Sequence, residues 1–292
     1  MKEKILRMVM FMIIVISLIA IGLIIFFNIE DAKVYVPNKA EYSANIDEKN
    51  FNSRKLFIIT PKNIEKNEKV ILYFHGGSYM AEATKAHWDF LANVSNDTGN
   101  TIVMIDYPLA PKYTYKEVFK IVEPLYKEAV KKVGKDNLIL MGDSAGGGLA
   151  LALAELAAEQ NEELPSKVIL ISPWLDTKME NVNIDEVQKN DRELNKEALK
   201  LAGLAYAGKD GENSYLVNPI DGDLSKIRNL IIFTGTYDIL NPDVHVLEEK
   251  ARNAGNNVEI KEYEKASHIW LIDENSEIQK EAYNDLIECI KK

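Results

Sequence analysis

The sequence predicts a doubly wound α/β sheet, and two features of its 292 residues support that prediction. Short apolar runs rich in β-branched residues alternate along most of the chain with longer stretches of helical sequence. Several runs, such as Val70–Phe74, are apolar at consecutive positions, which is typical of strands buried on both faces of a parallel sheet. A chain of this length can bury one large core, so a single main domain is expected.

Seven runs fit strands by their length and composition. They are residues 56–60, 70–74, 101–105, 137–141, 167–172, 230–234 and 258–263. Helical sequence lies between most of them. The clearest helices are expected at residues 86–96, 116–133, 145–160 and 243–253.

One interval interrupts this alternation. Between Trp174 and Arg228 there is no strand signal, only charged helical sequence at residues 185–208 and then turn residues around Asn218-Pro219 and Asp221-Gly222. The interval follows the carboxyl end of a predicted strand, which is where the active sites of α/β proteins lie. A cap over a site is therefore expected here.

The composition is that of an ordinary globular protein, with 47% hydrophobic and 27% charged residues. The formal net charge is −10; residues 1–27 carry +2, so the remaining residues carry −12. A body this acidic should repel nucleic acid and anionic membrane surfaces, so no nucleic-acid partner is expected. Cys289 is the only cysteine, which excludes an intramolecular disulfide.

Residues 1–30 are expected to form an N-terminal membrane anchor. Residues 8–27 carry no charge, and a helix of that length spans roughly 30 Å, about the thickness of the hydrocarbon core of a bilayer. The alternative is a cleaved signal peptide and a secreted protein, but the run is long for a signal and no small residues follow it. Lys2, Lys4 and Arg7 precede the span, so the positive-inside rule predicts a single-pass protein of the cell membrane with the main domain outside the cytoplasm.

A serine stands in a glycine-rich turn between a predicted strand and a predicted helix. Residues 137–141 lead into Gly142-Asp143-Ser144-Ala145-Gly146, a Gly-x-Ser-x-Gly pattern. A nucleophile in a strained turn needs neighbours without a Cβ atom, because the strand and helix backbones approach each other closely there. A phosphate-binding turn is the alternative, but the Gly-Lys-Ser/Thr that would accompany it is missing. Ser144 is therefore predicted to be a nucleophile.

A second glycine turn, His75-Gly76-Gly77-Ser78-Tyr79, follows the strand predicted at residues 70–74. An acyl-transfer enzyme must stabilise the negative oxygen of its tetrahedral intermediate, and backbone amides on a glycine loop do so without reorganisation. Gly76 and Gly77, joined by the amide of Ala145, are predicted to form this oxyanion hole. A plain β-turn is the alternative, but the position of the turn upstream of the serine turn favours the oxyanion hole.

With these two turns the chain resembles the hormone-sensitive-lipase-like α/β-hydrolases, a family that includes arylacetamide deacetylases and bacterial esterases. The matching stretches are His75-Gly76-Gly77-Ser78-Tyr79, Asp106-Tyr107-Pro108-Leu109-Ala110-Pro111, Gly142-Asp143-Ser144-Ala145-Gly146-Gly147 and Ser172-Pro173-Trp174. The resemblance covers about residues 69–268. It departs from the family at Ser78, which stands where a third glycine is usual, although the first two glycines are those that the family uses as donors.

The resemblance implies an α/β-hydrolase fold with a mostly parallel eight-stranded sheet and a helical cap. The domain would comprise residues 31–292, with the cap drawn from about residues 31–52 and 176–209. Asp106 and Asp143 resemble structural carboxylates of the family. Tyr79 and Trp174 are expected to help line the substrate pocket.

Of the four histidines, His268 is the predicted general base. The triads of α/β-hydrolases run along the chain in the order Ser, Asp or Glu, His, and only His268 satisfies this order with a predicted strand immediately before it. His75 lies in the oxyanion turn. His87 and His245 lie in helical stretches, where surface or packing roles are expected.

Asp238 is the predicted acid of the triad, because it follows the strand at residues 230–234 through Gly235-Thr236-Tyr237. It would hold the imidazole in the right orientation and tautomer. Asp243 is the alternative acid, but it follows Pro242 at an expected helix start.

These residues predict a lipase-like serine carboxylesterase that forms an acyl-enzyme, with Ser144 attacking and His268 taking its proton. Caps in the family accompany short- to medium-chain acyl or acetyl esters, so a small-molecule ester is the expected substrate. No metal or cofactor is expected, since the sequence has no His-Glu-x-x-His, no cysteine pair and no phosphate loop with lysine. The alternatives are a serine peptidase or amidase on the same scaffold, and a non-catalytic ligand-binding receptor.

Overall fold

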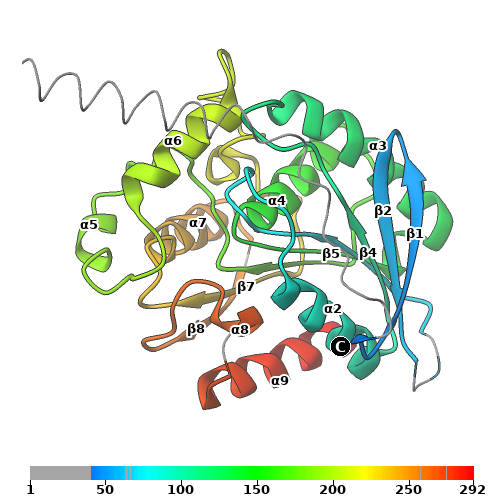
Figure 1. Cartoon of the computed structure of the whole chain (residues 1–292). Helices are drawn as coiled ribbons and strands as arrows, with labels where there is room; N and C mark the ends of the chain where they lie inside the picture. Colours follow the sequence, from blue (N-terminus) through cyan, green and yellow to red (C-terminus); the bar gives the residue numbers. More distant parts are fainter. Residues whose placement is uncertain (1–40, 63–64, 66, 257, 274) are drawn as a thin grey trace, which may run out of the picture. The chain divides into compact units, whose positions relative to one another are not determined.

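A computed structural model describes residues 41–62, 65, 67–256, 258–273 and 275–292 of the chain (Figure 1). Eight strands lie in these residues: β1 Asn45–Phe51, β2 Arg54–Thr60, β3 Val70–Phe74, β4 Thr101–Ile105, β5 Leu138–Asp143, β6 Lys167–Ile171, β7 Leu230–Gly235 and β8 Val258–Tyr263. The helices of the described part are α2 Lys85–Thr98, α3 Tyr115–Val133, α4 Ser144–Glu159, α5 Ile184–Val187, α6 Lys196–Ala207, α7 Asn241–Asn253, α8 Trp270–Asp273 and α9 Glu277–Lys291. Two short 3-10 helices are η2 Lys135–Asn137 and η3 Pro219–Asp221.

The strands form one sheet in the order β1-β2-β4-β3-β5-β6-β7-β8. The pairs β1–β2 and β2–β4 are antiparallel, and all other neighbours are parallel. The mostly parallel α/β sheet predicted from the sequence is therefore confirmed. The seven predicted strands coincide with β2 to β8, and the four predicted helices with α2, α3, α4 and α7, to within two residues at each end.

Strand β1 corrects one expectation, because residues 45–51 belong to the sheet rather than to the cap. β1 is an edge strand with mostly exposed, polar residues, so it carries no apolar run that would reveal it. Its register with β2 pairs Phe51 with Arg54 across a two-residue turn. Both turn residues, Asn52 and Ser53, have positive φ angles of 45° and 65°, the conformation that suits a tight hairpin.

Helices cover both faces of the sheet (Figure 1). α2 and α9 pack on one face, and α3, α4 and α7 lie on the other. Helix α4 is buried over its whole length from Ser144 to Ala158, and its sequence is apolar nearly all round because it lies between the sheet, α3 and η3. The central strands are thus buried on both faces, as their uninterrupted apolar sequences predict.

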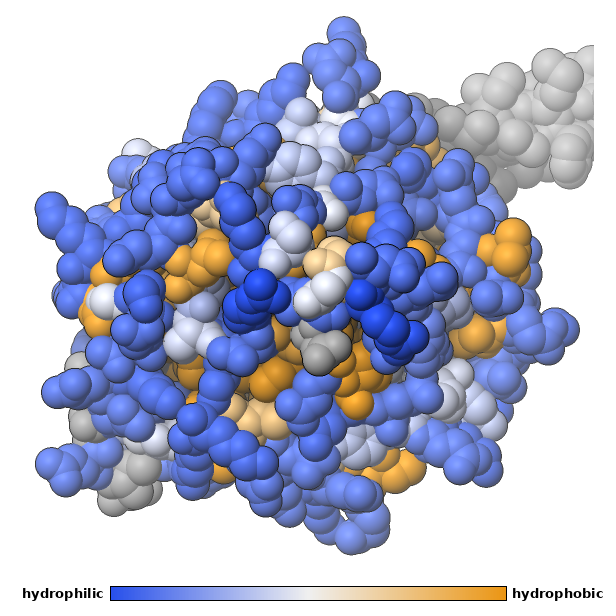
Figure 2. All heavy atoms as spheres, turned by 180° about the vertical axis from the view of Figure 1, so that it is seen from behind, coloured by the Kyte–Doolittle hydropathy of each residue, from blue (hydrophilic) through white to orange (hydrophobic). Residues whose placement is uncertain are grey.

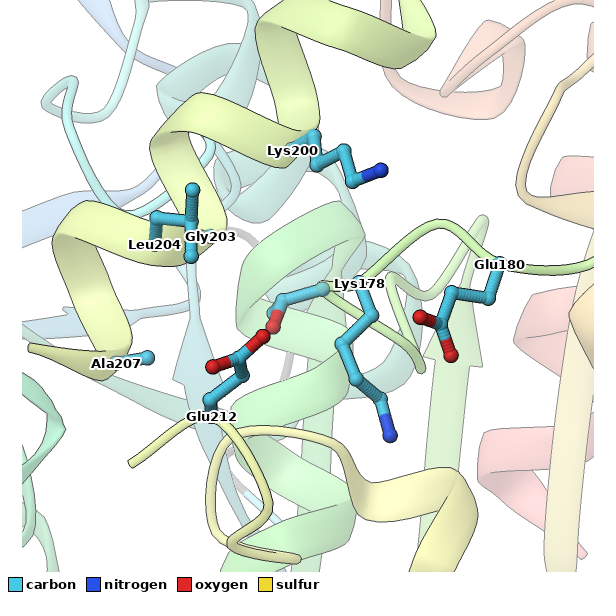
Figure 3. A pocket seen from close by; sticks show the side chains of 8 residues that line it. Lys178, Glu180, Lys200, Gly203, Leu204, Ala207 and Glu212 are labelled. Carbon is cyan, nitrogen blue, oxygen red and sulfur yellow. The ribbon is translucent and has the colours of Figure 1, made fainter. Parts of the chain in front are cut away.

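The long interval between β6 and β7 contains α5, α6 and η3, and within its residues 172–229 the structure has no strand, as predicted. We call these residues the insertion. Helix α6 begins where the side chain of Asn195 accepts a hydrogen bond from the amide of Ala198. A pocket of about 310 Å³ opens on the insertion (Figure 3). Its lining residues are Thr177, Lys178, Glu180, Lys200, Gly203, Leu204, Ala207 and Glu212.

The described surface is mostly polar. The face seen in Figure 2 is covered largely by hydrophilic residues, with apolar residues visible only in small groups. Two of the most exposed large apolar side chains of the described residues, Leu201 and Leu204, lie on α6. No helix in these residues is long and apolar enough to cross a bilayer. The predicted anchor at residues 8–27 lies outside the described residues.

Candidate active site

The site lies where the winding of the sheet reverses. β3 and β5 are neighbours, but the chain continues from β3 to β4 on one side and from β5 to β6 on the other. The loops that leave the carboxyl ends of β3 and β5 therefore diverge, which creates the crevice where ligands bind in such sheets. The turn at His75–Tyr79 follows β3, and Ser144 follows β5, so the topology brings the two predicted glycine turns together.

Ser144 occupies a strained, tightly packed turn. It is the first residue of α4, and its φ angle of 51° lies in the left-handed region, which a serine adopts only under constraint. A Cβ atom on Gly142 would lie 2.3 Å from the carbonyl oxygen of Gly146, and one on Gly146 would lie 2.0 Å from that of Phe74. The glycines are required because three backbone segments meet here, as the sequence pattern indicates.

We expect Gly146→Ala to destabilise the protein by about 3 kcal/mol or more, because its Cβ would collide with backbone that cannot move aside. Urea unfolding of the purified variant measures this. Gly255→Ala is the matched control: nothing lies within 4 Å of its added Cβ, and only its φ of 74° opposes the change, so a loss of about 1 kcal/mol is expected. Equal stability of the two variants would contradict the close packing at the turn.

Ser144, His268 and Asp238 form a hydrogen-bonded chain. The Nε2 atom of His268 lies 3.0 Å from Ser144 Oγ, and its Nδ1 atom lies 2.9 Å from Asp238 Oδ2. The three side chains come from the loops after β5, β8 and β7 and are almost completely buried, with Ser144 and His268 each about 5% exposed. The structure thus brings together the three residues predicted to form a triad, with the imidazole between the hydroxyl whose proton it can take and the carboxylate that orients it.

Backbone amides help to hold Asp238 and the loop of His268 in place. Asp238 Oδ1 accepts a hydrogen bond of 2.9 Å from the amide of Leu240, which leaves Oδ2 directed at His268. The amide of Ile269, next to His268, donates to Ser172 Oγ at 3.2 Å. Ser172 belongs to the Ser-Pro-Trp stretch, so this motif supports the histidine loop.

The insertion also reaches the site, through a residue that the sequence analysis did not identify. Asp191 Oδ2 accepts a hydrogen bond of 2.9 Å from the amide of Ile239, which adjoins Asp238. Its Oδ1 accepts from the amides of Glu193 and Leu194. Asp191 is one of many acidic residues in a charged stretch, and nothing in the sequence distinguishes it from its neighbours.

The other candidates for base and acid lie elsewhere. Asp243 lies in the first turn of α7, where its Oδ1 accepts a hydrogen bond of 2.9 Å from Asn181 and its burial raises its pKa to about 7. His87 is buried and its Nε2 lies 3.2 Å from Asp143 Oδ2, while His245 is exposed and contacts Glu262. Packing and surface positions were expected for these two histidines.

The pKa of His268 is raised above its ordinary value of 6.5. Burial of the ring alone would lower it, but the charge of Asp238 and its hydrogen bond favour the protonated imidazole and outweigh burial. Asp143 and Asp191 add smaller contributions in the same direction. The imidazole is therefore a better proton acceptor than a histidine in water.

The turn after β3 differs from the prediction at one residue. The amide of Gly76 donates a hydrogen bond of 2.9 Å to Asp143 Oδ1, so it is already engaged and the expectation that it binds the oxyanion is not supported. No described group accepts a hydrogen bond from the amide of Gly77 or of Ser78. Ala145, in the first turn of α4, has an amide that the helix itself leaves without a partner.

Ser78, which stands where the family usually has a third glycine, has a backbone angle that favours glycine. Gly77, Ser78 and Tyr79 have successive φ angles of 115°, 55° and 60°, all in the region that favours glycine. The turn is closed by hydrogen bonds of 2.9 Å from the amides of Met80 and Ala81 to the carbonyl of Gly77. The loop thus holds positive φ angles at two residues that are not glycine, at the cost of strain at Ser78 and Tyr79.

Asp143 connects the turn after β3 with the turn that carries Ser144. It accepts hydrogen bonds from Tyr73 Oη at 2.5 Å and from the Gly76 amide, and its second oxygen faces His87. Burial alone would raise its pKa, but the charge of His87 and the hydrogen bonds from His87 and Tyr73 hold that pKa below its ordinary value. This is a structural role, as the resemblance implies.

Asp106 also has the contacts of a structural residue. Its carboxylate pairs with Arg54 at 2.8 Å, and its carbonyl oxygen accepts from Arg54 Nε at 2.6 Å.

Tyr79 and Trp174 do not line an open pocket in the structure. Their side chains are 1% and 0% exposed, and their rings stack with centroids 5.8 Å apart. The indole nitrogen of Trp174 donates to the carbonyl of Asp176 at 3.0 Å. The expectation that these two residues contact substrate is therefore not supported, because aromatic packing covers both rings.

The pocket on the insertion has different chemistry from the site at Ser144. Four of its eight lining residues are charged, and none belongs to the Ser–His–Asp chain or to the turn after β3 (Figure 3). Within the residues that the structure describes, no group of three or more His, Cys, Asp and Glu side chains could hold a metal ion.

Comparison with known proteins agrees with this geometry. Residues 71–272 match a protein family described as having the alpha/beta hydrolase fold. An esterase from Acinetobacter venetianus is 30% identical over 197 residues, which are 67% of this chain and 65% of that protein. An acetyl-hydrolase from Streptomyces hygroscopicus is 27% identical over 206 residues, 69% of this chain and 68% of that protein. The match with the Acinetobacter esterase thus spans just under two thirds of its length.

Solved structures share the fold. An esterase of the bacterial hormone-sensitive lipase family superposes with a TM-score of 0.80 at 23% identity, covering 85% of this chain and 84% of its own. A hormone-sensitive lipase from a metagenome library gives a TM-score of 0.81 at 23% identity, covering 87% and 85%. These likenesses agree with the resemblance seen in the sequence motifs. By its sheet, its two glycine turns and the match over residues 71–272, the chain belongs to the family of α/β-hydrolase-fold proteins.

Proposed function

We propose that the protein is a serine hydrolase that cleaves small carboxylic esters with short- to medium-chain acyl or acetyl groups. The observation that carries the proposal is the chain of hydrogen bonds from Asp238 through His268 to Ser144. It joins a nucleophile, a base and an orienting acid at the carboxyl edge of the sheet. The names of the relatives, an esterase and an acetyl-hydrolase, support the same reaction class.

In the proposed reaction Ser144 Oγ attacks the ester carbonyl while His268 Nε2 takes the hydroxyl proton. Asp238 Oδ2 accepts the hydrogen on Nδ1, which keeps Nε2 free to act as the base and stabilises the imidazolium that forms. The carbonyl oxygen becomes an oxyanion. The amides of Gly77, Ser78 and Ala145 are the donors that we propose for it, since the Gly76 amide is bonded to Asp143.

Collapse of the tetrahedral intermediate breaks the ester C–O bond. His268 gives its proton to the departing alkoxide, and the acyl group stays on Ser144. Water then attacks this acyl-enzyme and gives up a proton to His268. The acid leaves as the Ser144 hydroxyl is restored.

A substrate series tests the proposal against its two alternatives. Hydrolysis of p-nitrophenyl esters from acetate to decanoate is expected, with the highest kcat/KM among the short and medium chains. Faster turnover of aminoacyl p-nitroanilides than of any ester would instead identify an amidase or peptidase. A folded protein that binds esters but turns none over would identify a receptor.

The pH dependence of kcat/KM follows from the pKa of His268. The base must be neutral to accept a proton, so activity falls as the pH drops through a pKa that lies above 6.5. Asp238, Asp143 and Asp191 raise this pKa, and Glu193 also interacts with the histidine's charge. Asp191→Asn removes one of the negative charges, so the acid limb of the variant should lie at lower pH than that of the wild type.

A profile of kcat/KM between pH 5 and 9, measured for both proteins with a p-nitrophenyl ester, gives the position of the acid limb in each. An acid limb that stays in place or moves to higher pH in Asp191→Asn would show that Asp191 does not act on His268. Ser95→Ala, a change of a buried serine on α2 far from the site, is the control whose limb should not move.

We further propose that residues 8–27 anchor the protein in the cell membrane, with the catalytic domain outside the cytoplasm. The uncharged run and the basic residues before it support this arrangement. The full chain should fractionate with membranes, and protease added to spheroplasts should digest its catalytic domain. Recovery of the full chain in the soluble fraction would refute the anchor, and a mature protein that begins after residue 27 would identify a cleaved signal peptide.

A further inference from the structure

Three aromatic rings from distant parts of the chain stack behind the oxyanion turn. Tyr79 ends the turn, Trp174 follows β6, and Tyr206 lies near the end of α6 in the insertion. The rings of Tyr79 and Tyr206 are nearly parallel, at 4° with centroids 3.6 Å apart, and Trp174 stacks on Tyr79 at 5.8 Å. All three side chains are almost completely buried. The insertion therefore contacts the oxyanion turn directly, through Trp174 at its start and Tyr206 of α6.

This contact falls on a strained segment. Ser78 and Tyr79 both have left-handed φ angles, and a non-glycine residue keeps such a conformation only where its surroundings hold it. The backbone of Tyr79 is held by one hydrogen bond of 2.8 Å, from the amide of Ala110 to its carbonyl oxygen. Its side chain is held by stacking and by a hydroxyl contact with Tyr206. Loss of the Tyr206 ring would remove the closest of these contacts and leave Trp174 stacked on Tyr79, so less would oppose relaxation of the turn toward ordinary backbone angles.

We propose that Tyr206 is a positioning residue that keeps the amides of Gly77 and Ser78 directed at the oxyanion. The inference rests on the proposed function, since it assigns Tyr206 a part in the same reaction without contact to the substrate. The proposal requires α6 to be packed against the turn for the reaction to proceed. The insertion would then support catalysis in addition to the cap role expected from the sequence. A shift of about 1 Å in a catalytic group is enough to lower a rate by roughly 10²-fold.

Tyr206 is the member of the stack that can be changed most cleanly. Trp174 also donates to Asp176 and Met179 through its indole nitrogen, and its amide donates to the carbonyl of Ser144, so its loss would disturb the nucleophile as well. The hydroxyl of Tyr206 meets that of Tyr79 within the stack. Tyr206→Phe therefore keeps the ring and removes only this hydroxyl contact, whereas Tyr206→Leu removes the ring as well.

The experiment compares these two variants with Leu199→Ala, which removes a buried side chain of the same helix away from the turn. For each full-length protein we would measure kcat and KM for p-nitrophenyl butyrate, inhibition by a trifluoromethyl ketone, and Tm. The ketone forms a negatively charged adduct that needs the same amides. Active-site titration corrects kcat for any unfolded fraction.

Tyr206→Leu should lower kcat by about 10- to 100-fold and change KM by less than about threefold. It should raise the inhibition constant of the ketone by the same factor by which it lowers kcat. Tyr206→Phe should keep kcat within about twofold, and Leu199→Ala should lower Tm while keeping kcat. Wild-type kcat and ketone affinity in Tyr206→Leu would overturn the positioning role and leave the esterase proposal intact. A wild-type protein without esterase activity would overturn the proposed function and this inference with it.

Discussion

Replacing Ser144 with alanine is expected to lower kcat for ester hydrolysis by about 10⁴-fold or more. The hydroxyl oxygen is the atom that would carry the acyl group, and it is the hydrogen-bond partner of His268 Nε2. Water attacking directly would be the remaining route, assisted only by the oxyanion hole and by substrate binding. The measurement is kcat with p-nitrophenyl butyrate for the wild type and the variant, purified in the same way.

Ser95→Ala is the control for this substitution, because it also removes a buried serine hydroxyl, one that donates to the carbonyl of Asn100 at 2.9 Å. It should lose some stability and keep its activity. A loss of less than about tenfold in Ser144→Ala would show that the serine is not the nucleophile.

Asp238→Asn is expected to lower kcat by about 10⁴-fold while leaving the fold intact. The hydrogen bond from the Leu240 amide keeps an oxygen at the Oδ1 position, so the new amide nitrogen would face His268. That nitrogen donates to Nδ1, which moves the imidazole proton to Nε2. The ring would then present a donor to Ser144 and could no longer accept the serine's proton.

Asp243→Asn is the matched control, since the sequence alone left Asp243 as an alternative acid. Its carboxyl group is buried and bonded to Asn181, and it makes no contact with His268. Kinetics of the two variants at the pH optimum should therefore differ by about three orders of magnitude or more. Similar losses of kcat in both variants, or a larger loss in Asp243→Asn, would show that Asp238 is not the acid of the triad.

The parts of the fold that follow from local pattern were predictable from the sequence. The buried strands β3 to β7 have uninterrupted apolar runs, and the Gly-x-Ser-x-Gly turn is constrained by backbone approaches that only glycine permits. The order Ser144, Asp238, His268 is also a property of the chain. These features depend on neighbours in sequence, or on a fixed order of strands.

What the sequence did not reveal depends on contacts between distant residues. β1 is a polar edge strand that is visible only through its pairing with β2. The Gly76 amide is bonded to an aspartate 67 residues away, so a glycine that looks available in the motif is not free. Tyr79 is stacked with both Tyr206 and Trp174, and nothing in the helical sequence of α6 indicates which of its faces meets the oxyanion turn.

The central claim is that His268, held by Asp238, activates Ser144 as the one nucleophile of the protein. Reaction with a fluorophosphonate, followed by intact-mass measurement and peptide mapping, tests it most directly. We predict one adduct per chain, located on Ser144, with labelling that disappears in Ser144→Ala and slows strongly in His268→Ala. A folded wild-type protein that takes up no label, or that is labelled on another residue while Ser144 stays free, would contradict the account.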